Sequence, residues 1–347
     1  MKKLLSIITI MAMLFVLAGC ATDAKTKDTE EPSTEQTTET NDAAEQKEET
    51  ENNEKVKIGI IQPVEHPSLN QIREYIIIGL EEQGLKDKIE ITYKDAQGDP
   101  SNINTIISQF VGDKMDIIVP IGTGASQSAA AATKEIPVIF AAVSYPVDAG
   151  LVKDVSKPEA NVTGVSDAID VELIFNLAFE LTPDIETFGF IYNTGEPNSA
   201  SAINKAKEYC HAKGIKYVEA TITNSSELQQ ATQALLEKAD AIFTPTDNTV
   251  ASAMPVLSAE AQKAGIPVYT GADSMVIDGG FATVGIDYTI LGRQVAEMVK
   301  KVVDGVEPSN IPAETMSKFA TIVNLTTADK IGVELSEEQL KGFQIVK

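Results

Sequence analysis

Residues 56–93 read VKIGIIQPVEHPSLNQIREYIIIGLEEQGLKDKIEITY, and this stretch decides the fold. Residues 56–61 are a short apolar run that predicts a buried strand. Residues 67–84 are amphipathic and predict a helix, and residues 89–93 predict a second strand. Strands that alternate with helices in this way form doubly wound parallel sheets, so the chain begins with an α/β unit.

The same alternation continues along the chain and then restarts near residue 187. Further strands are predicted at 117–121, 137–140, 187–192, 216–221, 241–243, 267–269 and 281–286. Further helices are predicted at 101–114, 125–134, 199–213, 226–238, 249–264 and 288–304. Two consecutive sheets of one kind predict two similar α/β lobes. Ligands of open α/β sheets bind beyond the carboxyl ends of the strands, so we expect a site in the cleft between the lobes.

The N-terminus has the features of an export signal. Two lysines precede an apolar run, residues 4–17, that is shorter than the roughly 20 residues a membrane-spanning helix needs. The run ends in Leu-Ala-Gly-Cys, and these small residues before Cys20 resemble the lipobox of bacterial lipoproteins. We therefore expect residues 1–20 to be a lipoprotein signal peptide. Cys20 is the residue expected to carry the lipid, palmitate among the acyl chains.

The next segment is acidic and lacks large apolar side chains. Residues 21–54 contain twelve acids, three lysines and no Val, Ile, Leu, Phe, Met, Tyr or Trp. Such a segment buries too little apolar surface to offset its ordering entropy, so it is predicted to be a disordered tether. The formal net charge of −23 argues against a nucleic-acid partner and against docking on anionic lipid.

A glycine-rich turn follows the predicted strand 117–121 and opens a helix. It reads GTGASQ over residues 122–127. Free N–H groups at a helix N-terminus favour an anion, and glycines allow a close approach. Without the lysine of a nucleotide-binding loop, a carboxylate is the expected anion. Thr123, Gly124 and Ser126 are therefore candidate carboxylate contacts, and the alternative is a plain capping turn.

Two other turns place polar residues at the same edge of the sheets. Ser144, in the turn after strand 137–140, is a second candidate carboxylate contact. Tyr145 either stacks on a ligand ring or closes the loop. Asn198 and Ser199 open a helix in the second lobe and either clamp the carboxylate or only cap that helix.

The remaining candidates are expected to contact the α-ammonium group or the side chain of the ligand. Asp247 is the first candidate partner of an α-ammonium and Asp273 the second, with helix capping as the alternative role of Asp247. Gln62, Pro63, Glu65 and His66 are predicted to line the side-chain end of the site, where Glu65 is the candidate acceptor for a polar ring atom such as an indole N–H or a phenolic O–H.

Enzyme chemistry is not indicated. The two histidines, His66 and His211, are far apart in the sequence and are an unsuitable pair for a metal. No nucleophile elbow and no phosphate loop with lysine is present. We expect no catalytic residue, no metal site and no cofactor.

Seven segments taken together resemble a known family. They are Ile60–Pro67, Gly122–Gln127, Ala142–Pro146, Gly164–Asp167, Tyr192–Ser199, Pro245–Val250 and Gly285–Tyr288. Their order and spacing resemble ABC transporter substrate-binding lipoproteins of the tryptophan and tyrosine (aromatic amino acid) binding type, and the resemblance covers residues 56–347.

The resemblance implies a type I periplasmic-binding-protein-like fold with a multi-crossing hinge. Lobe 1 would comprise 55–166 plus about 287–317, and lobe 2 would comprise 167–286 plus about 318–347. It also implies a monomer, lipid-anchored on the extracellular face of the cell membrane. Such a protein works with ABC permease and ATPase subunits and binds free tyrosine, tryptophan or phenylalanine.

Two alternatives remain open at this stage. One is a receptor of the same fold for another small solute, such as a branched amino acid or a nucleoside. The other is a surface-displayed adhesin or interaction lipoprotein that uses the tether for display.

Overall fold

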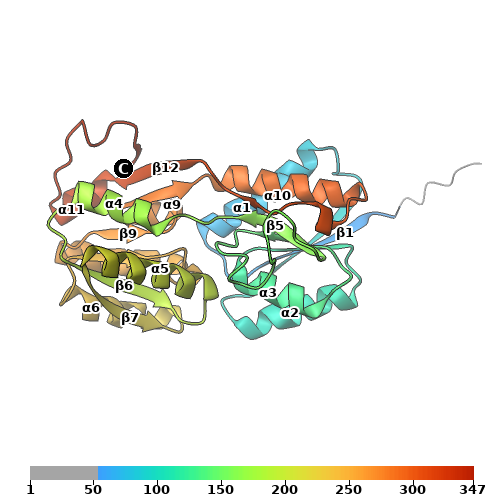
Figure 1. Cartoon of the computed structure of the whole chain (residues 1–347), viewed down its shortest axis with the longest axis horizontal. Helices are drawn as coiled ribbons and strands as arrows, with labels where there is room; N and C mark the ends of the chain where they lie inside the picture. The colour runs from blue at the N-terminus through green and yellow to red at the C-terminus, as the bar shows by residue number, and fades with distance from the viewer. Residues whose placement is uncertain (1–53) are drawn as a thin grey trace, which may run out of the picture. The chain divides into compact units, whose positions relative to one another are not determined.

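The computed structural model describes residues 54–347, which form one compact unit with two sheets (Figure 1). The expected signal peptide, the lipid-carrying Cys20 and all of the expected tether except its last residue lie outside the described residues. The doubly wound α/β class predicted from the sequence is confirmed.

Lobe 1 is built on a six-stranded sheet of order β11-β5-β4-β3-β1-β2, in which every strand pair is parallel. Its strands are β1 (Val56–Gln62), β2 (Ile89–Asp95), β3 (Ile117–Pro120), β4 (Val138–Ala141), β5 (Val162–Ser166) and β11 (Glu314–Thr315). Its helices are α1 (Pro67–Glu82), α2 (Pro100–Gly112), α3 (Thr123–Ala132) and α10 (Tyr288–Val303).

Helices cover both faces of this sheet. Successive side chains of a strand point to opposite faces. In β1, Ile60 packs into the core that includes α1 and α10, and Ile61 packs into the core beneath α2 and α3. The two covering helices α1 and α10 lie side by side (Figure 1). A Cβ on Gly79 would lie 2.7 Å from the Cβ of Ala296, so this close packing requires glycine.

Lobe 2 is built on a seven-stranded sheet of order β13-β12-β10-β9-β8-β6-β7. Its strands are β6 (Thr187–Asn193), β7 (Lys216–Ile222), β8 (Ala241–Thr244), β9 (Val268–Thr270), β10 (Ala282–Ile286), β12 (Phe319–Asn324) and β13 (Gln344–Val346). Its helices are α4 (Val171–Leu181), α5 (Pro197–Lys213), α6 (Leu228–Leu236), α7 (Asn248–Ser252), α8 (Met254–Ala264), α9 (Asp273–Ile277) and α11 (Leu325–Ile331). Strand β12 runs antiparallel to β10, so this sheet is mixed at its C-terminal edge.

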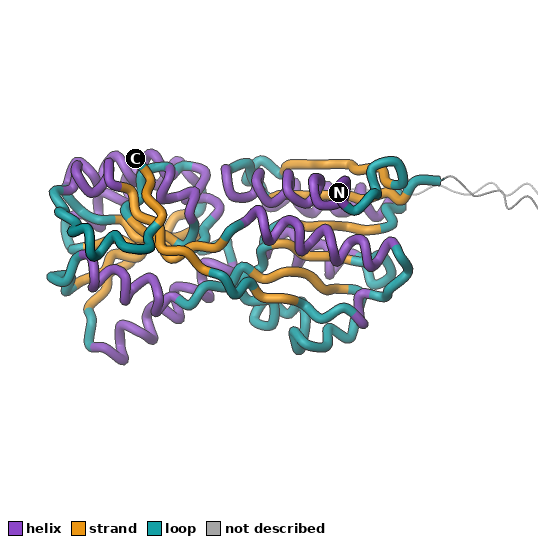
Figure 2. Tube along the Cα trace, turned by 90° about the horizontal axis from the view of Figure 1, so that it is seen from above, coloured by secondary structure: helices purple, strands orange, loops and turns teal. Residues whose placement is uncertain are grey.

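The chain passes between the two sheets three times: from β5 to α4, from β10 to α10, and from β11 to β12. The crossing segments are neighbours, because Ser166 pairs with Thr315 and Ile286 pairs with Phe319. The connections between the lobes therefore gather in one place (Figure 2). Two residues with polar side chains lie at these crossings: Asp167 directly follows β5, and Tyr288 is the first residue of α10.

One predicted helix, 249–264, is divided in the structure into α7 and α8. Pro255 lies in the first turn of α8, where its missing N–H costs nothing. Across residues 54–347, none of the helices combines the length and apolar character needed to span a bilayer.

Candidate functional site: the cleft between the lobes

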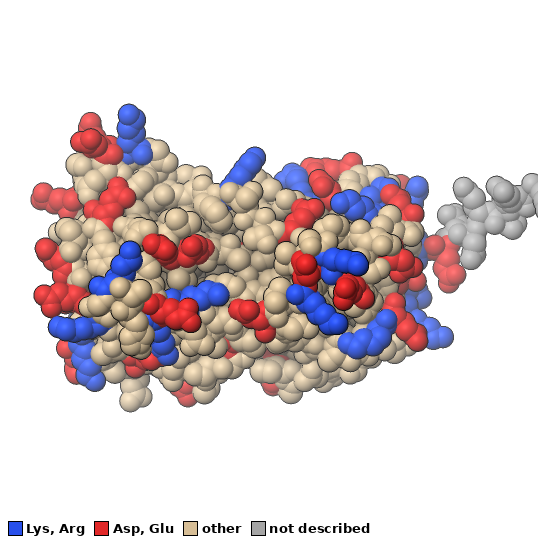
Figure 3. Space-filling view, in the orientation of Figure 1, with Lys and Arg blue, Asp and Glu red and all other residues tan. Residues whose placement is uncertain are grey.

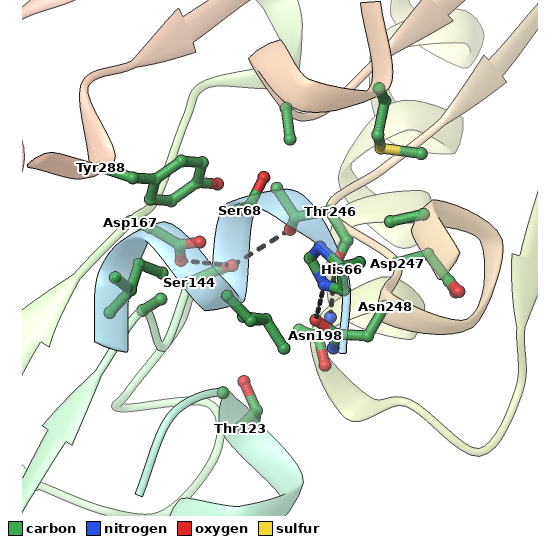
Figure 4. A pocket seen from close by; sticks show the side chains of 17 residues that line it. His66, Ser68, Thr123, Ser144, Asp167, Asn198, Thr246, Asp247, Asn248 and Tyr288 are labelled. Carbon is green, nitrogen blue, oxygen red and sulfur yellow. Dashed lines mark hydrogen bonds between the residues drawn. The ribbon is translucent and has the colours of Figure 1, made fainter. Parts of the chain in front are cut away.

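An inner hollow lies between the lobes where the strands of both sheets end. The space in and around it is about 400 Å³, part of which is open solvent. It is lined from lobe 1 by His66, Ser68, Leu69, Ile72, Gly122, Thr123, Ala142, Ser144 and Tyr288, and from the crossing and lobe 2 by Asp167, Asn198, Thr246, Asp247, Asn248, Ala251, Ala272 and Met275 (Figure 4). An outer hollow of about 1060 Å³, also counted with open space, shares Thr123, Asn198 and Asn248 with it. The two hollows therefore adjoin each other in the cleft between the lobes.

The N-terminus of α3 supplies an anion-binding end. Gly122 caps this ten-residue helix with φ 84°, a conformation that favours glycine. The hydroxyl oxygen of Thr123 is buried in the wall of the hollow and has no hydrogen-bond partner. Helix N-termini leave backbone N–H groups free, and their dipole favours negative charge. Ser126 is turned elsewhere, because its hydroxyl donates to the carbonyl oxygen of Gly122 at 2.7 Å.

A buried carboxylate, Asp167, lies in the wall of the same hollow. The hydroxyl of Ser144 donates to its Oδ1 at 2.8 Å. Burial raises the pKa of Asp167, and hydrogen bonds from Ser144 and Tyr288 oppose that rise. A buried carboxylate of this kind gains most from a cationic partner, because an unpaired buried charge is costly.

The carboxylate of Asp247, in contrast, is held by hydrogen bonds within lobe 2. Its Oδ1 accepts from the N–H of Val250 at 2.9 Å, which caps α7. Its Oδ2 accepts from the N–H of Asn193 at 2.7 Å and from the hydroxyl of Ser199 at 2.8 Å. Burial and the nearby Glu196 raise its pKa well above the usual range. Although Asp247 borders the hollow, its carboxylate is turned away from the cavity (Figure 4).

Three other predicted residues lie away from the inner hollow. Asp273 is the first residue of α9, and its Oδ1 accepts from the N–H of Ser274. Gln62 is fully buried and donates to the side chain of Asn70 at 2.9 Å. Glu65 is exposed and pairs with Arg73 in lobe 1 at 3.7 Å.

The remaining predicted residues lie along the cleft. Pro63 and Gly124 line the outer hollow. Asn198 borders both hollows and donates to the carbonyl oxygen of Thr246 at 2.8 Å. Tyr145 faces the second lobe, with Nζ of Lys205 4.9 Å from the centre of its ring. The predicted candidates therefore divide between the inner hollow, the outer hollow and the loops that hold them.

Three side-chain hydrogen bonds cross the cleft and join the lobes. They run from His66 to Asn248 at 3.1 Å, from Ser68 to Ser274 at 2.6 Å, and from Ser144 to Thr246 at 3.3 Å. The lobes are thus in contact in this structure.

The sequence did not point to four residues of the inner wall that carry polar side chains: Ser68, Thr246, Asn248 and Tyr288. His66, which was predicted to line the side-chain end of the site, does line this wall. It placed Asp167 near the hinge only. The one available signal was position, because each of them lies in or beside a turn that follows a strand or opens a helix.

Residues 57–346 match the family model described as ABC transporter substrate binding protein. The chain belongs to this family. The match spans both lobes and all three crossings, so the family assignment covers the whole described unit. The substrate-binding family binds its solute without transforming it, and the prediction that the chain is not an enzyme is confirmed.

Members of the substrate-binding family and solved structures resemble this chain closely. A tyrosine-binding protein of Clostridioides difficile is 38% identical over 84% of this chain and 85% of its own length. A Streptococcus ABC domain solved in complex with L-Trp is 36% identical, covers 85% of this chain and 100% of its own, and has a TM-score of 0.82. A ligand-free, open substrate-binding protein with adhesive properties from Clostridium difficile is 40% identical, covers 84% of this chain and 99% of its own, and has a TM-score of 0.64.

The two TM-scores differ although the sequence identities are similar. The lobes of this substrate-binding protein are therefore arranged more as in the L-Trp complex than as in the open, ligand-free chain. This agrees with the three hydrogen bonds that cross the cleft.

Proposed function

We propose that this chain is the lipid-anchored solute receptor of an ABC importer and that it binds a free aromatic amino acid in the cleft. One observation carries the proposal: the inner hollow has an anion-binding end and a buried carboxylate. The unpartnered hydroxyl of Thr123 and the free N–H groups of α3 suit the carboxylate of an amino acid. Asp167 suits its ammonium group.

Part of the wall of the inner hollow is apolar. Leu69, Ile72 and Met275 line it, together with the small side chains of Ala142 and Ala251. Ligand sites commonly combine such apolar walls with a few polar groups that fix orientation. An aromatic side chain buries enough surface to exploit this wall. Tryptophan, tyrosine and phenylalanine are therefore the proposed ligands.

The three crossings serve as the hinge in this proposal. Lobe 1 comprises 55–166 plus about 287–317, and lobe 2 comprises 167–286 plus about 318–347. Separation of the lobes breaks the hydrogen bonds across the cleft and admits the solute. Closure around the solute then presents a form that the permease recognises, with separate ATPase subunits driving transport. The receptor acts as a monomer.

The lipid on Cys20 and the acidic tether 21–54 hold the receptor at the extracellular face of the cell membrane. Acidic and basic side chains are interspersed on the face shown in Figure 3, without a large basic patch on that face. Anchoring by lipid rather than by surface charge is consistent with the net charge of −23. Metabolic labelling with an alkyne-bearing palmitate should mark the full-length chain and should not mark Cys20→Ser.

The ligand is tested by isothermal titration of the full-length chain in detergent. The protein is first unfolded and refolded to strip any carried solute. Tyrosine, tryptophan, phenylalanine, leucine and adenosine are then compared. Micromolar or tighter binding of an aromatic amino acid supports the proposal. Binding of leucine or adenosine alone contradicts the ligand assignment and leaves the receptor role in place.

Surface adhesion is the second candidate function. The observation that favours it is the similar Clostridium difficile protein, which is described as having adhesive properties. The proposed tether suits display away from the membrane. A purified chain that binds no solute and adheres to host cells would favour this function over transport.

A further inference from the structure

A chain of hydrogen bonds fixes the orientation of one amide in the cleft. The carboxylate of Glu196 accepts from the side-chain nitrogen of Asn248 at 2.6 Å and from its backbone N–H at 2.9 Å. A carboxylate only accepts, so it holds the amide nitrogen of Asn248 on its own side. The amide oxygen of Asn248 is thereby left facing His66 across the cleft, 3.1 Å from its Nε2.

This orientation determines the tautomer of His66. An amide oxygen carries no proton, so Nε2 of His66 must donate the hydrogen bond. A neutral imidazole has one N–H group, so Nδ1 of His66 carries a free lone pair. Nδ1 is buried and has no hydrogen-bond partner, although the side chain lines the inner hollow. His66 is only 7% exposed, and burial lowers its pKa, which keeps the ring neutral near pH 7.

We propose that Nδ1 of His66 determines specificity by accepting a hydrogen bond from the ring of the ligand, an indole N–H or a phenolic O–H. This inference rests on the proposed function and goes beyond it, because it ranks the aromatic amino acids. Tryptophan or tyrosine donates a hydrogen bond to the buried Nδ1 of His66. Phenylalanine leaves it unpaired, and a site built around a hydrogen bond rejects the analogue that lacks it.

His66 also has a structural role, since its Nε2 joins the lobes. The two roles use different nitrogen atoms and are separable by substitution. In asparagine the amide oxygen is attached to Cγ, as Nδ1 is in histidine. In glutamine the amide nitrogen lies one bond further out, as Nε2 does. His66→Asn therefore keeps the acceptor and loses the bond to Asn248, and His66→Gln does the reverse.

The experiment compares two matched ligand pairs by isothermal titration of the full-length chain. The pairs are tryptophan with 3-benzothienylalanine, whose sulfur replaces the ring N–H, and tyrosine with phenylalanine. Each variant is scored by the ratio of dissociation constants within a pair, so a general loss of affinity cancels. We expect the wild type to favour the donor-bearing member of at least one pair by about tenfold or more. His66→Asn should keep that ratio within about threefold, and His66→Gln should bring it close to one.

Three results would overturn the inference. The first is a wild type that binds phenylalanine as tightly as tyrosine and 3-benzothienylalanine as tightly as tryptophan. This result would show that Nδ1 accepts no hydrogen bond from the ligand ring, and it would leave the proposed function in place. A ratio kept in His66→Gln assigns the ring contact to another residue. If no aromatic amino acid binds at all, the proposed function fails and the inference fails with it.

Discussion

The hydroxyl groups of Ser68 and Ser274 lie 2.6 Å apart and join helix α1 of lobe 1 to helix α9 of lobe 2. Both side chains are buried in this arrangement. When the lobes separate, water replaces each partner, so this bond exists only in the closed form. Groups that interact only in the closed form shift the equilibrium between open and closed states, and ligand affinity depends on that equilibrium.

Ser274→Ala should therefore weaken the binding of every ligand to a similar extent. Loss of one hydrogen bond of about 1 kcal/mol predicts a rise in dissociation constant of about fivefold, with the ranking of ligands unchanged. Ser258→Ala is the matched control, because Ser258 is also buried in lobe 2 and its hydroxyl donates to the carbonyl oxygen of Asp278 within that lobe. Titration and small-angle scattering of the ligand-free forms measure the two effects. Equal affinity in Ser274→Ala and wild type would contradict a role in closure.

Asp167 and Asp247 should respond differently to the same substitution. Asp167→Asn retains an acceptor for Ser144 and loses the charge proposed to bind the ammonium group, so we expect the dissociation constant to rise about 10- to 100-fold. Its unfolding free energy should not fall, since burial disfavours the charged form. Chemical unfolding and titration of the same samples separate the two effects.

Asp247→Asn should instead lower stability. Both of its carboxylate oxygens accept hydrogen bonds, and an amide nitrogen at either position leaves a buried donor such as the N–H of Val250 or Asn193 unpaired. We expect a loss of about 1–3 kcal/mol in unfolding free energy, with ligand affinity of the folded protein changed much less than in Asp167→Asn. A stable Asp247→Asn that binds no amino acid would reverse the two assignments.

These two aspartates show what sequence patterns reveal and what they omit. The turn after a strand was predicted correctly for Asp247, because apolar periodicity is a local signal, whereas strand β5 before Asp167 was not predicted. Which carboxylate is free for a ligand depends on partners far along the chain. Asp247 is occupied by Asn193 and Ser199, 54 and 48 residues away.

The same reasoning explains the differences in the fold. Most helices and parallel strands were predicted because each carries its own periodicity, whereas β5 and α4 were not predicted. The antiparallel edge formed by β12 was not predicted, since it follows from pairing with β10 rather than from a local pattern. Ser126 illustrates the limit within the glycine-rich turn, because its hydroxyl closes the turn and Thr123 keeps the unpartnered hydroxyl.

Asp273 should make the stability of the ligand-free protein depend on pH. Burial, aided by the charge of Asp287, raises the pKa of Asp273 to about 6 from an ordinary value of 3.8. The folded chain thus holds a proton that the unfolded chain releases, and stability is lost as the pH rises from about 4 through 6.

Asp273→Asn should remove this loss. We expect the variant to be more stable than wild type by about 1–3 kcal/mol at pH 8 and equal to it at pH 4. Urea unfolding at both pH values measures the difference. Asp329→Asn, an exposed position in the same lobe, is the control and should change stability little at either pH. A constant difference at pH 4 and pH 8 would show that Asp273 does not titrate in this range.

Protonation of His66 should weaken ligand binding at low pH. Burial lowers the pKa of His66 from 6.5, the hydrogen bond to Asn248 opposes this, and the charge of Glu196 opposes it further. The unfolded chain takes up this proton near pH 6.5, so the stability contributed by His66 is full above that pH and is lost as the pH falls below it. Protonation also converts Nδ1 from an acceptor to a donor, which removes the proposed bond from the ligand ring.

Affinity for the donor-bearing ligand should therefore be constant from pH 8 to about 6.5 and should fall at lower pH. In His66→Asn the acceptor does not titrate, so the ratio of affinities between tryptophan and 3-benzothienylalanine should stay constant down to pH 5. In the wild type this ratio should decline toward one as the pH falls through the lowered pKa of His66, because only the donor-bearing ligand loses a bond. Titrations at pH 8, 7, 6 and 5 measure both ratios. An equal decline in His66→Asn would place the titrating group elsewhere in the cleft.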